Sequence, residues 1–354
     1  MKRIGNLYHQ ICSFENLRAA ALRARQGKGY RPEVLHFHYH LEAQILQLQK
    51  ELQSREYRPG PYRTFHIRDP KRRLISAAPY RDRIVHHALC RIIEPILDRT
   101  FISDSYANRT GKGTHQALDH CTYLTRQYPF VLKCDLEKYF PSIDHEILFG
   151  LVARKIKCRE TLWLVRTILE NSNPQEGVVH YFPGDDLFTP FTRRQGIPIG
   201  NLTSQIFANI LLNPFDHFVK ERLGCRGYVR FVDDFLIFGR EKKTLHQMID
   251  TVQAYLDTLR LKIHPNKCQV MPTRYGVEFL GWRVFPDYRR LRRTTGVRFQ
   301  RRLRVLREEY ASGIKSQKEV KNSIMSWIGH LAHGDTWGLR NKLLGETCFV
   351  RGTV

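Results

Sequence analysis

Apolar residues recur at helical spacing through the first 56 residues of the chain. The segments 15–26 (ENLRAAALRARQ) and 41–53 (LEAQILQLQKELQ) show this most clearly and predict amphipathic helices. The turn-forming stretch YRPGPYR at 57–63 closes this helical section. Residues 64–79 (TFHIRDPKRRLISAAP) then predict two alternating strands with a turn at RDPK.

A second group of elements lies between residues 82 and 143. The stretch 82–97 (DRIVHHALCRIIEPIL) predicts a helix with Asp82 as its N-cap. A basic, glycine-rich loop at 105–118 (SYANRTGKGTHQAL) leads into another helix. Such loops can hold phosphate on backbone N–H groups, although this one lacks the spacing of a P-loop ATPase. Residues 130–143 (FVLKCDLEKYFPSI) predict a short apolar strand that ends at Asp135.

The remaining apolar segments predict a mixture of helices and strands. We expect helices over 146–172, 201–214 and 243–260, a hairpin over 177–198, and strands over 261–272 and 275–285. From residue 288 onward the chain is rich in arginine and mostly helical in pattern. The 354-residue chain is long enough for two or three subdomains. Because it has no internal repeat and no low-complexity linker, we expect these subdomains to pack as one unit.

Two adjacent acids interrupt an apolar run at 228–238 (YVRFVDDFLIF). Aromatic and β-branched residues dominate both sides, which predicts two strands joined by a hairpin with Asp233 and Asp234 at its tip. On its own, this pattern favours the simpler interpretation of an ordinary Asp-Asp turn. Asp135 changes the interpretation, because a carboxylate at the end of another strand could meet the hairpin acids at one sheet edge.

Three carboxylates in one place repel one another, which raises their pKa values unless cations are present. Magnesium suits such a site because it binds hard oxygen ligands from a few carboxylates together with substrate phosphates. Two Mg²⁺ ions about 3.5–4 Å apart activate an attacking oxygen and stabilise the leaving oxygen of an in-line displacement. We therefore expect Asp135, Asp233 and Asp234 to bind two Mg²⁺ ions in a polymerase or a nuclease.

The net charge indicates the substrate. Lys and Arg outnumber Asp and Glu by 58 to 34, which gives a formal charge of +24 and favours a polyanionic partner, nucleic acid first. An anionic membrane surface is the alternative, but neither terminus carries a basic amphipathic helix and no run of 18 apolar residues occurs. The N-terminus lacks an apolar signal-peptide region, and the eight cysteines are scattered without a CxxC pair. We therefore expect a cytoplasmic protein with reduced thiols and no membrane partner.

A set of motifs carries a family resemblance. DLEKYFPSIDH, IPIGNLTSQIFANILLNPFD, YVRFVDDF, LKIHPNK and VEFLGW, in this order, resemble the palm of a reverse transcriptase. KRRLISAAPYRDRIVHHAL and SYANRTGKGTHQAL resemble the fingers of bacterial members of that family. The resemblance implies an α+β, right-hand polymerase architecture with fingers, a palm with an antiparallel sheet, and a helical thumb. The expected divisions are an N-terminal helical extension at 1–60, fingers at 61–130, palm at 131–285 with a fingers-side insertion at about 146–195, and thumb at 286–354.

The resemblance also implies roles for single residues. Asp135, Asp233 and Asp234 would be the catalytic, metal-binding carboxylates, and Phe140 would exclude a ribose 2′-OH so that the product is DNA. The incoming nucleotide would contact Lys71, Arg73, Phe140, Ile199, Gly200 and Lys267, although any of the basic residues at 71–73 could hold the triphosphate. The template and primer would contact Arg109, Lys112, Arg289, Arg293 and Arg301. The simpler interpretation of each basic residue is a solvated surface charge.

The block at 199–205 indicates which group of reverse transcriptases the chain resembles. Most bacterial and retroviral relatives have QGxxxSP, whereas this chain has IGNLTSQ, with Ile199 in place of glutamine and Gln205 in place of proline. IGxxxSQ resembles the reverse transcriptases of diversity-generating retroelements, and SWIGHLAHGDTWGL and NLYHQICSFENL are also similar to that group. The resemblance implies copying of a template-repeat RNA into cDNA with errors opposite adenines, followed by mutagenic retrohoming into a target gene. The implied partners are the RNA, the RNA/cDNA duplex, dNTPs and a small, basic, oligomeric accessory protein.

Two alternatives stay open. A retron or group II intron-type reverse transcriptase would share the motifs, although intron enzymes usually add a maturase domain and only residues 286–354 follow the expected palm. A catalytically inactive RNA-binding protein with the same fold is the other alternative. The intact Asp135, Asp233 and Asp234 argue against it.

Overall fold

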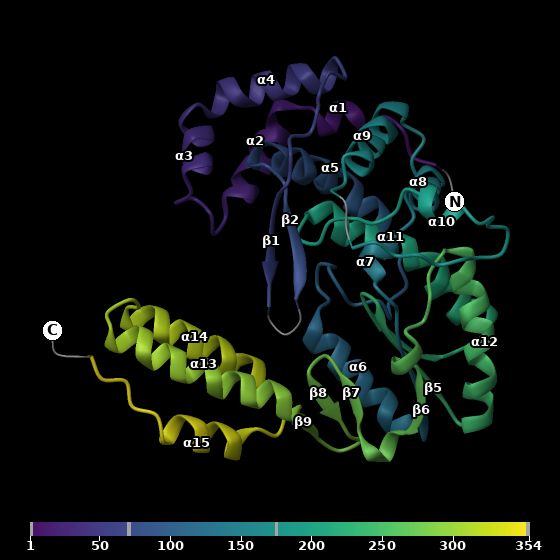
Figure 1. Cartoon of the computed structure of the whole chain (residues 1–354), viewed down its shortest axis with the longest axis vertical. Helices are drawn as coiled ribbons and strands as arrows, with labels where there is room; N and C mark the ends of the chain where they lie inside the picture. The colour runs from purple at the N-terminus through teal and green to yellow at the C-terminus, as the bar shows by residue number, and fades with distance from the viewer. Residues whose placement is uncertain (1–2, 69–71, 174–175, 352–354) are drawn as a thin grey trace.

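The computed structural model of the chain describes residues 3–68, 72–173 and 176–351, in which helices are combined with three antiparallel sheets. Figure 1 shows helices around the N-terminal half at the top, the central sheet below them, and a separate group of helices near the C-terminus. The mixture of helices and antiparallel sheets agrees with the α+β class expected from the sequence.

Helices cover the N-terminal end of the molecule: α1 (Tyr8–Ile11), α2 (Phe14–Arg25), α3 (Pro32–Tyr39) and α4 (Leu41–Gln53). The long helix α5 (Tyr80–Asp98) packs against α1, α2 and α3, and α4 packs against α2 and α3. The contacting face of α2 buries Leu17, Ala20 and Ala21, whose side chains are fully excluded from solvent. The helical pattern predicted for the first 56 residues is therefore confirmed.

The central sheet has the strand order β4-β5-β3-β6. Its strands are β3 (Phe130–Asp135), β4 (Gly227–Phe231), β5 (Asp234–Gly239) and β6 (Gln269–Pro272). Side chains alternate between the two faces of the sheet. Leu132 and Cys134 join a core with α11 (Leu202–His217) and α12 (Lys242–Thr258). Val131 and Leu236 join a second core with α6 (Thr114–Gln127), so the predicted apolar strand before Asp135 is an interior strand.

A two-stranded hairpin and a three-stranded sheet complete the β structure. The hairpin pairs β1 (Arg63–Ile67) with β2 (Arg73–Ala77), which confirms the two strands predicted over 64–79. In Figure 1 it extends from the N-terminal helices towards the central sheet. The third sheet consists of β7 (Val277–Phe279), β8 (Trp282–Val284) and β9 (Arg289–Leu291).

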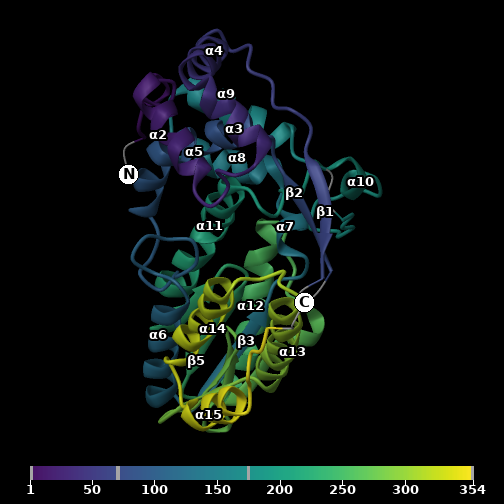
Figure 2. The same cartoon turned by 90° about the vertical axis from the view of Figure 1, so that its left-hand side faces the viewer.

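The C-terminal helices form a separate group: α13 (Arg293–Ala311), α14 (Gln317–Leu331) and α15 (Trp337–Gly345). Phe299 of α13 stacks on Trp327 of α14 with ring centroids 3.4 Å apart, so these two helices pack side by side. Both views show the group at the same end of the molecule as the central sheet and away from α1–α4 (Figures 1 and 2). Within the described ranges, no helix combines the length and the apolarity that crossing a membrane requires.

The segment between β3 and α11 differs from its prediction. It contains α7 (Tyr139–Ser142), α8 (His145–Ala153), α9 (Arg159–Glu170) and α10 (Thr189–Thr192). The single helix predicted over 146–172 is two helices, because the backbone of Lys155 and Lys157 leaves the helical path to bond with Ile4 at 2.9 and 2.8 Å.

The hairpin predicted over 177–198 is wrong, because the described part of this stretch forms no strand. Acidic side chains accept the backbone N–H groups that a strand ladder would use. Asp185 accepts from Phe182 at 2.8 Å, and Asp186 accepts from Phe188 at 2.9 Å. The Asp185 carboxylate also forms a buried ion pair with Arg193 at 2.5 Å. These bonds fold the stretch into turns and the short helix α10.

The sequence predicted Asp82 as the N-cap of α5, but the structure shows that Asp82 is not the cap. The helix α5 begins earlier, at Tyr80, after the N-cap residue Pro79. The Asp82 carboxylate is buried inside the first turn and accepts the Tyr57 hydroxyl at 2.7 Å and the Gly60 N–H at 2.8 Å. It therefore ties the turn at 57–63 to α5.

Candidate active site

A two-residue turn joins β4 to β5 beside the end of β3. Phe231 pairs with Asp234 across this hairpin, so Val232 and Asp233 form the turn. On its other side, Asp234 pairs directly with Asp135, the last residue of β3. Directly opposed residues of antiparallel strands lie on one face of the sheet with Cβ atoms about 4.5–5.5 Å apart. The strand and the hairpin thus converge at one end of the central sheet, and the three acids lie together there.

Burial and mutual repulsion disfavour the charged forms of these acids. Burial raises the pKa of Asp233 to about 6, and the nearby charge of Asp135 acts in the same direction. Burial also raises the pKa of Asp234 to about 7, with repulsion from Asp135 and Asp233. The predicted upward shift of the pKa is therefore present at Asp233 and Asp234, although loss of hydration is a larger cause than repulsion.

Lys267 is a cation in direct contact with this group. It lies in η2 (Pro265–Lys267), one turn of 3₁₀ helix that occupies part of the strand predicted over 261–272. Its ammonium forms an ion pair with the Asp135 carboxylate. The His264 N–H donates to the Asp135 carbonyl at 2.8 Å, which holds η2 beside the end of β3.

The acids fit a divalent cation that arrives with a phosphate substrate. Asp234 Oδ1 is buried without a hydrogen-bond partner, so this oxygen has a lone pair to offer a cation. Among the residues that the structure describes, no group of three or more His, Cys, Asp or Glu forms a ready-made metal cage. Mg²⁺ does not require one, because it binds one or two carboxylates and takes waters and substrate phosphates as its other ligands. Asp135, Asp233 and Asp234 are therefore the residues that could hold it.

The β1–β2 hairpin contributes a basic residue to the site. Arg73, at the start of β2, is exposed to solvent. Burial raises the pKa of Asp233, and the charge of Arg73 is near enough to oppose that shift. Lys71, the other basic residue predicted to bind nucleotide, lies outside the described residues.

Ile199 and Gly200 lie beside the same hairpin. The Ser76 N–H of β2 donates to the Ile199 carbonyl at 3.2 Å. Gly200 has a φ of +117°, and a Cβ at this position would lie 3.3 Å from Ile75 Cγ2. Both the backbone conformation and the close approach to β2 favour glycine here.

Phe140 lies in α7, close in sequence to Asp135. Its side chain is half-buried, and its carbonyl accepts the Ile197 N–H at 3.0 Å. The neighbouring Tyr139 is buried and its hydroxyl donates to the Ala208 carbonyl of α11 at 2.6 Å. These bonds connect α7 both to α11 and to the segment that precedes Ile199.

The structure gives Arg109 several internal partners, and its predicted template contact stays a prediction. Its guanidinium donates to the Asp98 carboxylate and to the carbonyls of Ile102 and Ser105 at 2.6, 2.6 and 2.9 Å. Its side chain is only 8% exposed, so it has little surface left for a phosphate. These bonds fold the glycine-rich loop onto the end of α5. Lys112 of the same loop donates to a backbone carbonyl at 2.9 Å, and its phosphate contact stays a prediction.

The predicted primer contacts near the C-terminus divide into two kinds. Arg289 in β9 is 13% exposed and donates to Thr122 Oγ1 at 2.6 Å and to the Asp119 carboxylate at 2.7 Å. These bonds hold β9 against α6, and the primer contact of Arg289 stays a prediction. Arg293 and Arg301 are exposed on α13, and their contact with nucleic acid stays a prediction.

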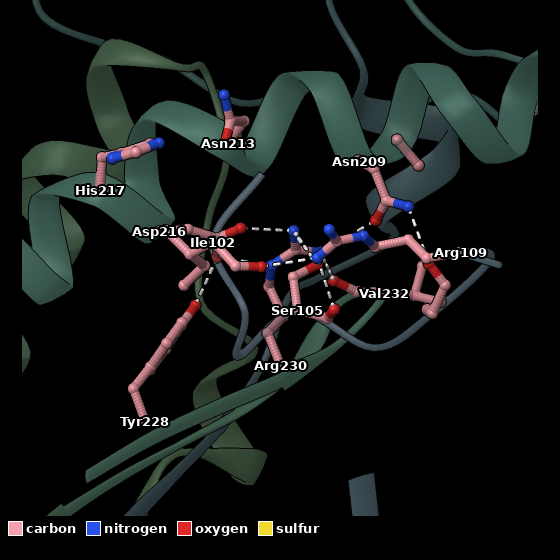
Figure 3. Close-up of polar contacts among 12 residues, drawn as sticks. Ile102, Ser105, Arg109, Asn209, Asn213, Asp216, His217, Tyr228, Arg230 and Val232 are labelled. Atoms are coloured by element: carbon pink, nitrogen blue, oxygen red, sulfur yellow. Dashed lines mark hydrogen bonds and ion pairs between the residues drawn. The ribbon is translucent and has the colours of Figure 1, made fainter. Parts of the chain in front are cut away.

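Sequence reasoning missed the buried ion pair behind the site. Arg230 of β4 and Asp216 of α11 are fully buried, with 2.6 Å between nitrogen and oxygen. Figure 3 shows that Asn209 and Tyr228 extend this network, with bonds of 3.3 Å to Arg230 and 2.8 Å to Asp216. A single arginine inside an apolar strand was the one signal in the sequence, because a buried charge requires a partner.

The pKa shifts predict how pH and magnesium change stability. The pKa of Asp233 rises from 3.8 to about 6 and that of Asp234 from 3.8 to about 7. Between about pH 4 and about pH 7, the folded protein therefore binds more protons than the unfolded chain. The contribution of the two acids to the free energy of unfolding is complete below about pH 4 and is lost by about pH 7. Since Mg²⁺ binds the ionised acids, it should raise the melting temperature more at about pH 8 than at about pH 5. Thermal melts with EDTA or Mg²⁺ measure this, and an equal gain at both pH values would contradict it.

Comparison with known proteins places these residues in a family. The family model described as "Reverse transcriptase (RNA-dependent DNA polymerase)" matches residues 67–284, which include Asp135, Asp233 and Asp234. The chain is 26% identical over 286 residues to protein YkfC of Escherichia coli (strain K12), covering 69% of this chain and 71% of that protein. It is 25% identical over 183 residues to the group II intron-encoded protein LtrA of Lactococcus lactis subsp. cremoris. That match covers 51% of this chain and 29% of LtrA.

Among solved structures, the chain is similar to apo telomerase from Candida Tropicalis. The TM-score is 0.45 at 12% sequence identity, over 66% of this chain and 49% of that chain.

Proposed function

The chain belongs to the reverse transcriptase (RNA-dependent DNA polymerase) family and has a right-hand polymerase fold, and from this premise we propose that it copies an RNA template into DNA. The observation that carries the proposal is the direct pairing of Asp135 with Asp234 beside the turn at Asp233. This pairing presents three acids at one end of a sheet, as metal-assisted nucleotidyl transfer requires.

The side chains around the acids would each act on a different part of the reaction. Asp135, Asp233 and Asp234 would hold Mg²⁺, which when bound would activate the attacking primer oxygen and neutralise charge on the leaving pyrophosphate. Lys267 would offer a proton or a positive charge to that pyrophosphate, and its ion pair with Asp135 supports this role. Arg73 would neutralise the triphosphate. The missing Cβ of Gly200 would let the backbone approach the nucleotide closely.

We propose the following division of the chain into functional parts. Residues 61–130, with the β1–β2 hairpin, would be the fingers, and residues 131–285, with the central sheet, would be the palm. The helices α13 and α14 would be the thumb, within 286–354, and residues 1–60 would be an N-terminal extension. Arg293 and Arg301 would contact the duplex backbone through sequence-independent, salt-sensitive bonds.

Primer extension tests the activity. The purified protein, an RNA template with an annealed DNA primer, dNTPs and Mg²⁺ should give a full-length DNA product, and EDTA should stop its synthesis. A DNA template of the same sequence serves as the comparison for template preference. A product that forms equally in EDTA, or degradation of the primer in place of extension, would overturn the proposal.

We further propose that the enzyme belongs to the diversity-generating retroelement type. The block IGNLTSQ at 199–205 supports this, and its first residue, Ile199, lies next to the β1–β2 hairpin. The enzyme would then copy a template-repeat RNA into adenine-mutated cDNA with the help of a small, basic, oligomeric accessory protein. A pair of genomic repeats near the gene that differ mainly at adenines would support this type.

Replacing Ile199 with glutamine should lower misincorporation opposite template adenines by about 2- to 10-fold, because glutamine can hydrogen-bond near the nucleotide and isoleucine cannot. Sequencing of cDNA made on an adenine-containing RNA measures the error spectrum. Ile199→Leu is the matched control, since it keeps an apolar side chain and should keep the errors. An unchanged spectrum in Ile199→Gln would refute this account of infidelity.

An intron-type or retron enzyme is the second candidate, and the similarity to the group II intron-encoded protein LtrA favours it. The RNA that co-purifies with the protein distinguishes the candidates. A template-repeat RNA would support the retroelement type, whereas an intron RNA or a branched RNA–DNA product would support the alternative.

A further inference from the structure

A buried guanidinium lies directly behind the turn that carries Asp233. Arg230 donates to both carboxylate oxygens of Asp216 at 2.6 Å. The same guanidinium donates to Ser105 Oγ at 3.0 Å and to the Val232 carbonyl at 2.9 Å (Figure 3). Removing a charge from water is costly, and only a well-formed set of partners offsets that cost. One of these partners belongs to the turn itself.

The guanidinium joins three separate parts of the chain: helix α11, the loop before α6, and the β4–β5 turn. The backbone of Arg230 is held as well. Its N–H donates to the Asp104 carbonyl at 2.9 Å, and its carbonyl accepts the Tyr106 N–H at 3.0 Å. The Arg230 side chain therefore projects from a fixed backbone towards the turn.

The turn has a conformation that its sequence does not favour. Val232 has a φ of +58°, in the left-handed region that β-branched residues rarely adopt. Two-residue hairpin turns that need a positive φ usually place glycine or asparagine there. An external restraint is needed to keep valine in this conformation, and the bond from Arg230 to the Val232 carbonyl supplies one.

We propose that Arg230 is a positioning residue that orients Asp233 and Asp234 towards Asp135 by holding the Val232 carbonyl. The inference rests on the proposed polymerase function and adds to it a residue that touches neither substrate nor metal. Arginine suits the role because its planar fork reaches Asp216 and Val232 at the same time, whereas lysine offers a single ammonium.

Arg230→Lys tests the proposal, because it keeps a positive charge beside Asp216 but loses the fork. Outer partners of metal ligands typically change metal affinity by 10- to 100-fold when mutated, so the Mn²⁺ concentration for half-saturation should rise about tenfold or more. Electron paramagnetic resonance of free Mn²⁺ measures this binding in the complex with a chain-terminated primer. The Mg²⁺ dependence of primer extension should shift in parallel.

Tyr228→Phe is the matched control. It removes the hydroxyl that donates to Asp216 at 2.8 Å but leaves the bond between Arg230 and Val232. It should lower the melting temperature without changing half-saturation by Mn²⁺. The proposal is overturned if Arg230→Lys binds Mn²⁺ like the wild type, or if Tyr228→Phe weakens binding as much as Arg230→Lys does.

If Arg230→Lys shows no cooperative unfolding, a less disruptive variant tests the role of Arg230. Ser105→Ala removes one acceptor of the guanidinium and should raise half-saturation by Mn²⁺ about 2- to 10-fold. A wild-type value would then overturn the role of Arg230. If the wild-type complex itself binds no Mn²⁺ and Asp233→Asn changes nothing, the proposed polymerase function fails instead.

Discussion

Replacing Asp233 with asparagine should abolish RNA-templated primer extension while the protein stays folded. Asparagine has the same shape but no charge, so it cannot neutralise a divalent cation. Bound metal contributes several kcal/mol to the transition state, which corresponds to a loss of about 10³-fold or more in the rate of extension. Single-turnover extension on an RNA template measures the rate.

The melting temperature separates this effect from misfolding. Burial raises the pKa of Asp233, which means that its charge is poorly solvated in the folded protein. Removing that charge should therefore keep or raise the melting temperature in EDTA above about pH 7. A fall in melting temperature that parallels the loss of activity would point to misfolding in place of metal binding.

Glu146→Gln is the matched control for Asp233→Asn. The Glu146 side chain is 65% exposed on α8 and pairs with Arg166 at 3.1 Å, so its loss should leave extension unchanged. Equal extension by Asp233→Asn and the wild type would refute the metal assignment. If neither protein extends a primer but both bind the RNA, the chain is better described as a catalytically inactive RNA-binding protein.

Replacing Phe140 with alanine should let the enzyme incorporate ribonucleotides. In the proposed site the ring occupies the space that a ribose 2′-OH would need, so its removal opens that space. A misfit of one small group in a shaped pocket typically changes selectivity by roughly 10- to 200-fold, and we expect a loss of ribose discrimination in this range. The ratio of kcat/KM for dATP and ATP on a uridine template measures it.

Phe140→Tyr is the control, because it keeps a ring of the same width. It should retain discrimination and the Ile197–Phe140 backbone bond that holds α7. If Phe140→Ala loses activity with both nucleotides and keeps their ratio, Phe140 supports the fold and does not select the sugar.

The sequence predicted elements well where one periodicity extended over many residues. The N-terminal helices, the strand that ends at Asp135, and a hairpin at the two adjacent acids are present as expected. The tip of that hairpin differs from its prediction, because Val232 and Asp233 form the turn and Asp234 is the first residue of β5. Prediction from the sequence failed where side chains, or a backbone segment distant in sequence, take over the backbone hydrogen bonds. Asp185 and Asp186 fold the segment predicted as a hairpin, and the pairing of Ile4 interrupts the helix predicted over 146–172.

The arginines predicted to contact nucleic acid also show what the sequence could and could not predict. Arg109 and Arg289 have the same charge in the sequence as Arg293 and Arg301, yet the structure engages the first pair in internal bonds and exposes the second. Charge alone predicts attraction to nucleic acid, but burial depends on which carboxylates the fold brings within reach.

The sequence by itself determined the family, the three acids and the strands that carry them, because apolar periodicity and motif order are properties of neighbouring residues. Only the tertiary structure decided that Asp135 and Asp234 face each other and that Arg230 meets Asp216 behind the turn. These contacts join residues from different elements. Their distances depend on how strands and helices pack, which a local pattern of side chains does not specify.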